Sequence, residues 1–216
     1  MQFKYPLLNC LGRRDDQTKT ARNLIKKNFP VRLLENMEGE WSRNFTFIAT
    51  VFERPLCIVQ LLESIRAYYP TVPILICDMS REPLFNNQQE IHPGITWLTL
   101  PFENGHTVGL GRNHLLEHVN TPMFFLCDDD HVINRNTDIK PMHDFLQYSQ
   151  YDIIGGCQGK DDYGTAVFES DNDVVIQHFY RYHTELEKGI VSCDRISNTF
   201  LARTDAVRKI GWEERV

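Results

Sequence analysis

The sequence predicts an α/β fold in which a mostly parallel sheet is flanked by helices. From residue 45 onward, short and nearly continuous apolar segments alternate with segments of helical periodicity. Strands that are apolar on both faces are typical of a parallel sheet covered by helices on its two sides. Polar residues directly follow three of these segments, and in such sheets ligands bind where the strands end.

The first half of the chain contains the most regular elements. Residues 45–52 are rich in aromatic and β-branched side chains, a composition typical of a strand. A helix is expected over residues 55–69, because Pro55 suits the first helical position and apolar residues recur with helical spacing. A second helix is expected over residues 111–119. Further short apolar strands are expected over residues 73–77, 95–100 and 123–127.

The two ends of the chain are less regular. After residue 140, the pattern predicts helices over residues 141–148 and 205–210 and strands over residues 152–156, 165–168, 174–176 and 196–202. The second and third of these strands are placed to form a hairpin. Before residue 45 the sequence is polar and predicts one short helix over residues 18–27. We therefore divide the chain into an extension, residues 1–44, and a main domain, residues 45–216, on which the extension packs.

Composition and charge exclude several classes of protein. The 216 residues include 23 Lys and Arg against 29 Asp and Glu, and the net charge of -6 argues against a nucleic-acid partner. No apolar run approaches the roughly 18 residues that a membrane-spanning helix needs. The six cysteines form no Cys-x-x-Cys pair, which excludes zinc-ribbon and thioredoxin-like sites.

The run Asp128-Asp129-Asp130, directly after an apolar strand, is the strongest functional signal. Three adjacent carboxylates repel one another unless a cation lies among them, and oxygen ligands suit Mg²⁺ or Mn²⁺ together with a substrate phosphate. The alternative is a solvated acidic turn. His131 leaves two metal patterns open, Asp128-x-Asp130 and Asp129-x-His131. We favour the carboxylates, because imidazole is a better ligand for zinc or iron.

The segment Gly109-Leu110-Gly111-Arg112-Asn113 opens the second helix, and helix N-termini attract anions. It lacks the third glycine of a dinucleotide motif and the Lys-Ser/Thr of a P-loop. Arg112 suits a pairing with a phosphate or with an acidic residue at a strand end. Further along this helix, His114 and His118 have a spacing that can bind zinc. Because no third ligand is apparent nearby, we interpret them as two partly exposed histidines.

Taken in order, these residues resemble glycosyltransferases of the GT-A, family 2 type. The resemblance depends on Thr50-x-x-x-Arg54-Pro55, a strand leading to Asp78, the glycine segment with Arg112-Asn113, and the aspartate run. Residues 193–204, followed by Gly211-Trp212, narrow it to the β-1,4-N-acetylgalactosaminyltransferases related to ganglioside synthases. It covers residues 45–216 and implies a nucleotide-sugar-binding, Rossmann-like sheet.

The resemblance implies a metal-dependent, inverting transfer of a hexose or N-acetylhexosamine, such as GalNAc, from a UDP-sugar to a hydroxyl of a glycan or glycoconjugate acceptor. The implied metal is Mn²⁺ or Mg²⁺. Asp130 is implied as the direct metal ligand, Asp128 lies at the metal or the ribose, and Asp129 lies beside the nucleotide. The implied nucleotide-binding residues are Thr50, Glu53 and Arg54 at the uridine, Asp78 at the uracil or ribose, and Arg112 and Asn113 facing the nucleotide.

The resemblance assigns no catalytic base within the chain. Related enzymes continue after the Gly-Trp segment into an acidic, histidine-containing motif, so we expect the base beyond Val216 and the chain to be part of a larger transferase. Asp161, Asp162 and Glu169 lie in the irregular second half and are candidates for approaching the acceptor, although we favour their interpretation as ordinary loop carboxylates. Two alternatives stay open: an inactive or truncated nucleotide-sugar-binding module, and a metal-dependent nucleotidyltransferase.

The first residues show no signal-peptide pattern, so the expected location is cytoplasmic. A Golgi lumen is the alternative. The glycosylation sequon Asn44-Phe45-Thr46 supports that alternative only weakly, because it enters a predicted strand.

Overall fold

The computed structural model describes residues 14–26, 33–86, 88–100, 107–156, 165–171, 174–179, 181–187 and 189–214. Its helices are α1 (Arg14–Lys26), α2 (Pro55–Tyr68), α3 (Val108–His118), α4 (Lys140–Tyr148) and α5 (Thr204–Ile210), with a 3-10 helix η1 (Glu40–Asn44). Its strands are β1 (Phe45–Val51), β2 (Ile74–Asp78), β3 (Gln89–His92), β4 (Ile95–Thr99), β5 (Met123–Leu126), β6 (Ile153–Gly155), β7 (Ala166–Asp171), β8 (Val174–Phe179), β9 (Thr184–Glu187), β10 (Ile190–Ser192) and β11 (Phe200–Arg203).

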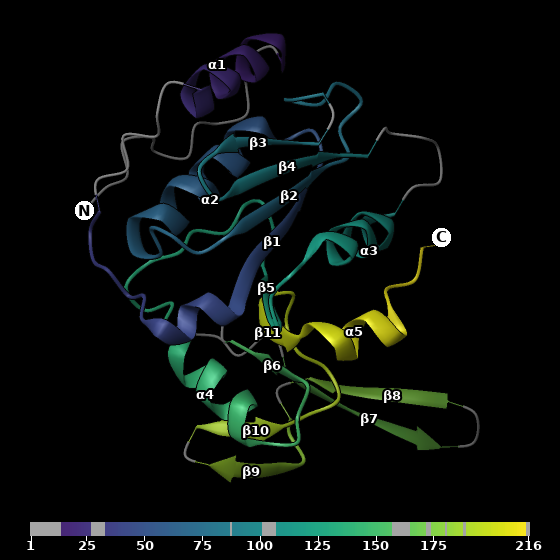
Figure 1. Cartoon of the computed structure of the whole chain (residues 1–216). Coiled ribbons are helices and arrows are strands. Elements are labelled where there is room, and N and C mark those ends of the chain that lie inside the picture. The colour runs from purple at the N-terminus through teal and green to yellow at the C-terminus, as the bar shows by residue number, and fades with distance from the viewer. Residues whose placement is uncertain are drawn as a thin grey trace.

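A seven-stranded sheet of order β3-β4-β2-β1-β5-β11-β6 forms the centre of the structure (Figure 1). β4, β2, β1 and β5 run parallel to one another. β3 is antiparallel to β4, and β11 is antiparallel to both β5 and β6. The register places Val51, the last residue of β1, beside Asp78, the last residue of β2. The predicted α/β class with a mostly parallel sheet is confirmed.

Alternate residues of the central strands face two separate hydrophobic cores. Phe47 and Phe125 lie in the core that α2 covers through residues such as Leu62. Ile48, the neighbour of Phe47, lies in the opposite core together with Leu115 of α3. Because both faces of the sheet are buried, its central strands are continuous apolar runs in the sequence.

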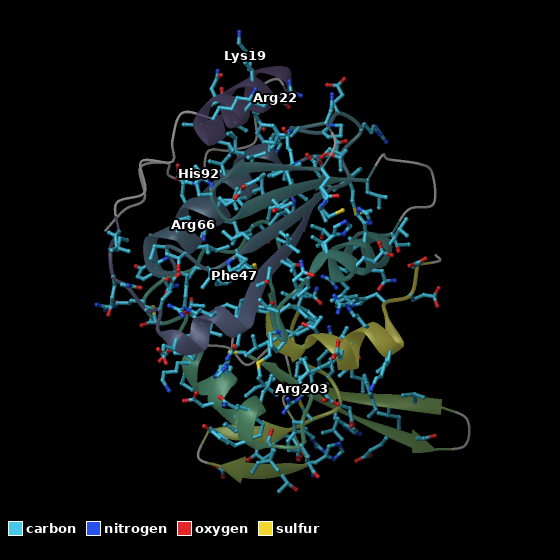
Figure 2. The ribbon with its side chains drawn as sticks, viewed as in Figure 1. Lys19, Arg22, Phe47, Arg66, His92 and Arg203 are labelled. Atoms are coloured by element: carbon cyan, nitrogen blue, oxygen red, sulfur yellow. The ribbon has the colours of Figure 1, made fainter. Side chains whose placement is uncertain are left out.

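Three arginine side chains donate hydrogen bonds to backbone carbonyls of segments distant in the sequence (Figure 2). Arg22 of α1 donates a 2.6 Å hydrogen bond to the carbonyl of Leu84. Arg66 of α2, buried at the other end of the parallel strands, donates a 3.0 Å bond to the carbonyl of Gly94. Arg203 of β11 donates to carbonyls at the C-terminal end of α4. Helix α1 thus packs against the sheet domain, whereas the division of the chain at residue 45 stays a prediction.

The structure differs from the predicted elements mainly in short segments. η1, β3, β9 and β10 were not predicted, and β9 carries the exposed side chains Thr184, Glu185 and Leu186. Such strands lack the apolar pattern that identifies buried ones. The predicted hairpin is confirmed, because β7 pairs antiparallel with β8.

Several element boundaries also differ; α1, for example, begins at Arg14, four residues before the predicted start. α3 begins at Val108, three residues before the predicted start, because the Thr107 hydroxyl accepts a hydrogen bond from the Leu110 amide and caps the helix. β11 begins at Phe200, four residues after the predicted start at residue 196. In the described part of the chain, no helix combines the length and the apolar character needed to cross a bilayer. The predicted location is not tested by that finding and stays a prediction.

Candidate functional site

The aspartate run begins where β5 ends, at the edge of the sheet formed by the carboxyl ends of the parallel strands. Cys127, the residue between β5 and the run, is buried, and its amide donates to the carbonyl of Ile48 in β1. The chain then turns at once, because the His131 amide donates to the Asp128 carbonyl at 3.1 Å. The Asp128 amide donates in return to Nδ1 of His131 at 3.2 Å. We call residues 128–131 the aspartate turn.

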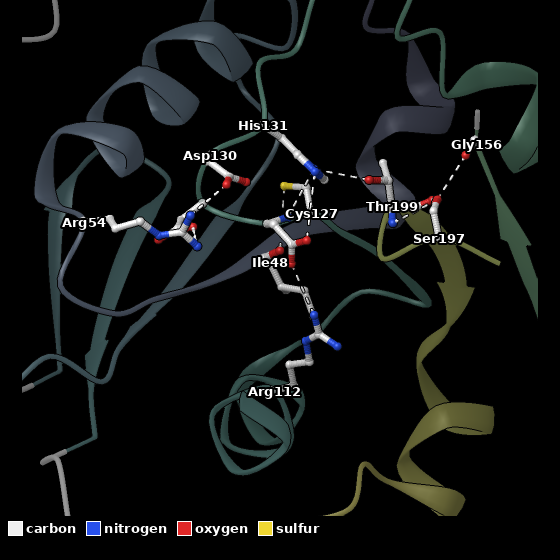
Figure 3. Close-up of polar contacts among 11 residues, drawn as sticks. Ile48, Arg54, Arg112, Cys127, Asp130, His131, Gly156, Ser197 and Thr199 are labelled. Carbon is white, nitrogen blue, oxygen red and sulfur yellow. Dashed lines mark hydrogen bonds and ion pairs between the residues drawn. The ribbon is translucent and has the colours of Figure 1, made fainter. Parts of the chain in front are cut away.

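Two arginines divide the three carboxylates of the aspartate turn between them (Figure 3). Arg54, directly before α2, places Nη2 at 2.6 Å from Asp129 Oδ1 and Nη1 at 2.7 Å from Asp130 Oδ2. Arg112 of α3 approaches from the other side and places Nη2 at 3.3 Å from Asp128 Oδ1. Arg112 thus makes one of the two pairings that suit it, the one with an acidic residue at a strand end, while its pairing with a phosphate stays a prediction.

Burial separates the middle aspartate from its neighbours. The Asp129 side chain is 2% exposed, whereas those of Asp128 and Asp130 are 33% and 50% exposed. Burial raises the pKa of Asp129 to about 6, and Arg54 opposes that rise while the two neighbouring carboxylates add to it. Keeping Asp129 ionised in this buried position therefore costs free energy.

The aspartate turn fits a divalent cation by its donor set. Three carboxylates face two guanidinium groups, which leaves an excess of negative charge at the sheet edge. Asp128 and Asp130 are the accessible members, and carboxylate oxygens are the ligands that Mn²⁺ and Mg²⁺ prefer. Among the described residues, however, the three carboxylates do not gather within 4.8 Å of one another. The metal assignment to Asp130 and Asp128 stays a prediction.

Asp78, the last residue of β2, is buried and closes the loop that follows its strand. Its Oδ1 accepts the amide of Ser80 at 3.0 Å, and its Oδ2 accepts the amide of Leu84 at 2.8 Å. Burial raises the pKa of Asp78, and these hydrogen bonds oppose the rise. The structure thus gives Asp78 a role in shaping the loop, and its predicted contact with a nucleoside stays a prediction.

Glu53 links the end of β1 to the same loop. Its amide donates to the hydroxyl of Ser80 at 2.9 Å, and its Oε1 accepts the amide of Arg81 at 3.0 Å. Glu53 adopts a left-handed backbone conformation, with φ at 61°. Non-glycine residues rarely adopt this region, and when they do they often lie at functional sites. The turn at Glu53 sets the position of the adjacent Arg54.

Gly111 allows α3 to approach the sheet beside Arg112. A Cβ at this position would lie 2.3 Å from Sδ of Met79 and 3.0 Å from Cγ2 of Thr50. A residue with a side chain at position 111 would therefore force α3 or Met79 to shift. The close approach at Gly111 also places Thr50, one of the predicted uridine residues, directly against the start of α3.

Asn113 contacts the segment after α5. Its Oδ1 accepts the Trp212 amide at 2.8 Å, and its Nδ2 donates to the Trp212 carbonyl at 2.9 Å and to Glu214 Oε1 at 2.6 Å. The structure brings Asn113 together with this segment, while Arg112, its neighbour, contacts the aspartate turn. The predicted contact of Asn113 with the nucleotide stays a prediction.

Sequence reasoning missed a chain of polar contacts that connects the aspartate turn to β11 and β6 (Figure 3). His131 Nδ1 lies 3.2 Å from the Thr199 hydroxyl, and the Ser197 hydroxyl donates to the Gly156 carbonyl at 3.1 Å. Because the Asp128 amide donates to Nδ1, the proton of a neutral His131 ring lies on Nε2. Nothing in the sequence indicates this network, because residues 131 and 199 are 68 positions apart.

Of the three carboxylates predicted for the acceptor side, the structure describes Glu169. Asp161 and Asp162 lie outside the described residues. Glu169 lies on β7, where its Oε2 is 3.0 Å from Nε2 of His178 on β8. A cavity of about 260 Å³ lies nearby, between β6 and the β9–β10 hairpin. Its lining includes Tyr151, Tyr182, Leu186, Ile196 and Ser197.

Comparison with known proteins identifies the family. The sequence profile described as Glycosyl transferase family 2 matches residues 46–211. This chain belongs to glycosyltransferase family 2. Mouse Beta-1,4 N-acetylgalactosaminyltransferase 2 is 31% identical over 176 residues, which make up 79% of this chain and 33% of that protein. Mouse Beta-1,4 N-acetylgalactosaminyltransferase 1 is 30% identical over 199 residues, which make up 87% of this chain and 36% of that protein.

This family 2 chain spans about a third of the length of those two relatives. Among solved structures, S. aureus TarS 1–349 aligns with a TM-score of 0.49 at 16% identity, covering 77% of this chain and 48% of that one. The predicted resemblance to family 2 glycosyltransferases and to β-1,4-N-acetylgalactosaminyltransferases is confirmed.

Proposed function

We propose that this chain provides the donor-binding domain of an inverting glycosyltransferase. The proposed reaction transfers N-acetylgalactosamine, or a related hexose or N-acetylhexosamine, from a UDP-sugar to a hydroxyl of a glycan or glycoconjugate acceptor. Family membership and the names of the two mouse relatives support this choice. Because the chain covers about a third of those proteins, the activity of the whole enzyme is part of the proposal.

The observation that carries the proposal is the arrangement of charge at the end of β5. Three carboxylates occupy one turn, with Arg54 on one side and Arg112 on the other. A UDP-sugar bound with a divalent cation presents both signs of charge, so its site needs carboxylates for the cation and guanidinium groups for the phosphates. The aspartate turn and its two arginines supply both within one edge of the sheet.

The proposed roles follow from exposure and chemistry. Asp130 and Asp128 would hold Mn²⁺ or Mg²⁺, which when bound supplies Lewis-acid stabilisation of the charge on the departing diphosphate. Arg112 is 10% exposed and already oriented by Asp128, so its guanidinium is preorganised to face phosphate oxygens. Arg54 limits the repulsion between Asp129 and Asp130. We assign no catalytic base among the residues that the structure describes.

We place the acceptor in the cavity between β6 and the β9–β10 hairpin. Its lining includes two tyrosines, Tyr151 and Tyr182, and aromatic rings offer an apolar face with a polar edge that suits a sugar ring. Ser197 also lines the cavity and belongs to the polar network that leads through Thr199 to His131. The network therefore connects the proposed acceptor side to the proposed donor side.

Calorimetric titration of UDP into the whole chain tests the donor site. We expect binding with Mn²⁺ or Mg²⁺ present and a large loss of affinity in excess chelator. Equal affinity under the two conditions would contradict the metal-dependent site.

Turnover separates the proposal from its two alternatives. A glycosyltransferase releases UDP from UDP-GalNAc when a glycan acceptor is added. A nucleotidyltransferase instead releases pyrophosphate from a nucleoside triphosphate, and a binding module binds the donor without releasing either product. Detection of pyrophosphate, or donor binding with no turnover across a panel of glycan acceptors, would favour the corresponding alternative.

A further inference from the structure

A second group of cation-ligating side chains lies on α3. Among the described residues, His114, Glu117 and His118 form a group whose ligand atoms all lie within 4.8 Å of one another. The sequence pointed to the two histidines but not to a third ligand, and the structure supplies it. His114 Nδ1 lies 3.4 Å from Glu117 Oε2, and the two imidazole rings have their centroids 4.9 Å apart. We call these three residues the α3 histidine site.

The hydrogen bonding of His118 prepares it to bind a metal. Its Nδ1 lies 2.9 Å from the carbonyl oxygen of His114, so Nδ1 carries the proton and donates it. In the neutral ring, this leaves the lone pair of Nε2 free for a cation. Metal-binding histidines commonly donate their second nitrogen to a backbone carbonyl in this way, which fixes both the tautomer and the ring orientation.

The helix that carries the α3 histidine site is held at both ends. At its N-terminal end, Gly111 lies against Met79 and Thr50, and Asn113 is bonded to Trp212. At its C-terminal end, Arg208 of α5 donates through Nε and Nη2 to the carbonyl of Leu116, at 3.1 and 2.7 Å. Ligands on a rigid helix lose less conformational freedom on binding than ligands on a loop.

We propose that His114, Glu117 and His118 bind a divalent late transition-metal ion, of which Zn²⁺ is the representative. Two imidazoles and one carboxylate form a common three-residue zinc ligand set, in which a fourth position is taken by water. The same set disfavours Mg²⁺ and Mn²⁺, which prefer oxygen ligands. The α3 histidine site shares no residue with the aspartate turn. The α3 histidine site favours Zn²⁺, whereas the turn favours Mn²⁺ or Mg²⁺. The zinc proposal does not depend on the proposed function.

Titration of ZnCl₂ into the whole chain tests this proposal. We expect one zinc ion bound through the α3 histidine site, and a rise in Tm of about 3–6 °C when free zinc is ten times the dissociation constant. His118→Gln should lower the zinc affinity by at least about 10–100-fold, and so should His114→Gln. Glutamine is a good helix former, so both variants should fold, as far-UV circular dichroism will check.

His178→Gln is the matched control. It removes another histidine that pairs with a glutamate, Glu169 at 3.0 Å, but that pair belongs to no group of three ligands in the described chain. Zinc affinity should be unchanged in this variant. The proposal is overturned if the intact chain binds no zinc, if His118→Gln and His114→Gln bind it as tightly as the unmodified chain, or if His178→Gln weakens binding as much as they do. Loss of zinc binding in Asp130→Asn alone would place the ion at the aspartate turn and would also overturn it.

Discussion

The aspartate turn and the α3 histidine site offer two contrasting ways to gather cation ligands on one domain. In the turn, the three consecutive carboxylates do not converge within 4.8 Å; Arg54 pairs with Asp129 and Asp130, and Arg112 pairs with Asp128. On α3, residues spaced three and four apart converge within 4.8 Å, because helical geometry places them on one face. Consecutive carboxylates therefore concentrate negative charge in one turn, whereas residues three and four apart on a helix bring their ligand atoms close together.

The two sites also differ in ligand chemistry. The turn offers only oxygen atoms and lies at the strand ends, where a nucleotide would supply further oxygen ligands. The α3 histidine site offers two nitrogens and one carboxylate and needs no substrate to complete three ligands. The first site is expected to bind its cation together with a ligand, and the second is expected to bind its cation alone.

The largest expected effect is that of Asp130→Asn on the aspartate turn. Loss of the accessible carboxylate should lower the affinity for UDP in Mn²⁺ by at least about 100-fold, since even indirect contacts to a metal are worth 10–100-fold. Calorimetric titration measures the change. Asp205→Asn is the matched control, because Asp205 lies on α5 with its side chain 89% exposed, and its affinity should match the unmodified chain. An Asp130→Asn chain that binds UDP normally would remove the metal role from this residue.

Gly111→Ala tests whether the position of α3 affects UDP binding at the aspartate turn more than zinc binding at the α3 histidine site. The new Cβ would lie 2.3 Å from Met79 Sδ, so the helix or Met79 must shift, at a cost of about 1–3 kcal/mol in unfolding free energy. A shifted Arg112 should weaken UDP binding, whereas zinc affinity should hold because its ligands share one helix. Urea unfolding and the two titrations measure this.

Gly156→Ala serves as the control for that substitution, because a Cβ there meets nothing within 4 Å among the described atoms. It should leave stability within about 0.5 kcal/mol of the unmodified chain. Equal destabilisation by the two alanines would contradict the close approach inferred at Gly111.

Asp78 provides a pH-dependent contrast with the more exposed aspartates. Its folded-state pKa is raised by burial above the ordinary 3.8, so the folded chain holds this proton to higher pH than the unfolded chain. The contribution of the protonated Asp78 to the unfolding free energy is fully present below pH 3.8, and it is lost as the pH rises through the folded-state pKa. Each unit of the rise corresponds to about 1.4 kcal/mol.

Asp78→Asn should therefore flatten the dependence of the unfolding free energy on pH upward from about pH 4. Urea unfolding at several pH values measures the slope. Asp205→Asn, in which the replaced carboxyl is exposed, should leave the slope unchanged. An identical slope in the Asp78→Asn chain and the unmodified chain would contradict the inferred effect of burial.

The smallest effect is expected for the paired but isolated Glu169 and His178. Glu169→Gln breaks a contact whose glutamate side chain is 62% exposed, so its contribution to stability should stay below about 1 kcal/mol. Thermal unfolding measures it. A larger loss would mean that the β7–β8 hairpin depends on this pair in a way that its exposure does not indicate.

The central strands could be predicted from the sequence because the burial of each strand is recorded in its own residues. β1, β2, β4 and β5 are buried on both faces, so each leaves a continuous apolar run. β3 and β9 leave no such run, because their exposed residues include Gln89, Glu90, Thr184 and Glu185. These strands are defined by pairing with a partner strand, which a local pattern does not contain.

The site was predictable in its composition but less so in its contacts. The position of the aspartates at a strand end followed from the sequence, and so did a charge partner for Arg112. The pairing of Arg54 with Asp129 and Asp130 joins residues about 75 positions apart, and the link from His131 to Thr199 spans 68. Such contacts depend on strand order, and β11 enters the sheet beside β5 only at the end of the chain.

We propose that this family 2 domain has two independent cation sites, one for a metal with UDP and one for zinc. A crossed titration tests it most directly: Mn²⁺ with UDP, and separately Zn²⁺, into the unmodified chain, Asp130→Asn and His118→Gln. We expect Asp130→Asn to lose UDP binding and keep zinc binding, and His118→Gln to lose zinc binding and keep UDP binding. A single variant that abolishes both, with its fold intact, would contradict the separation of the two sites.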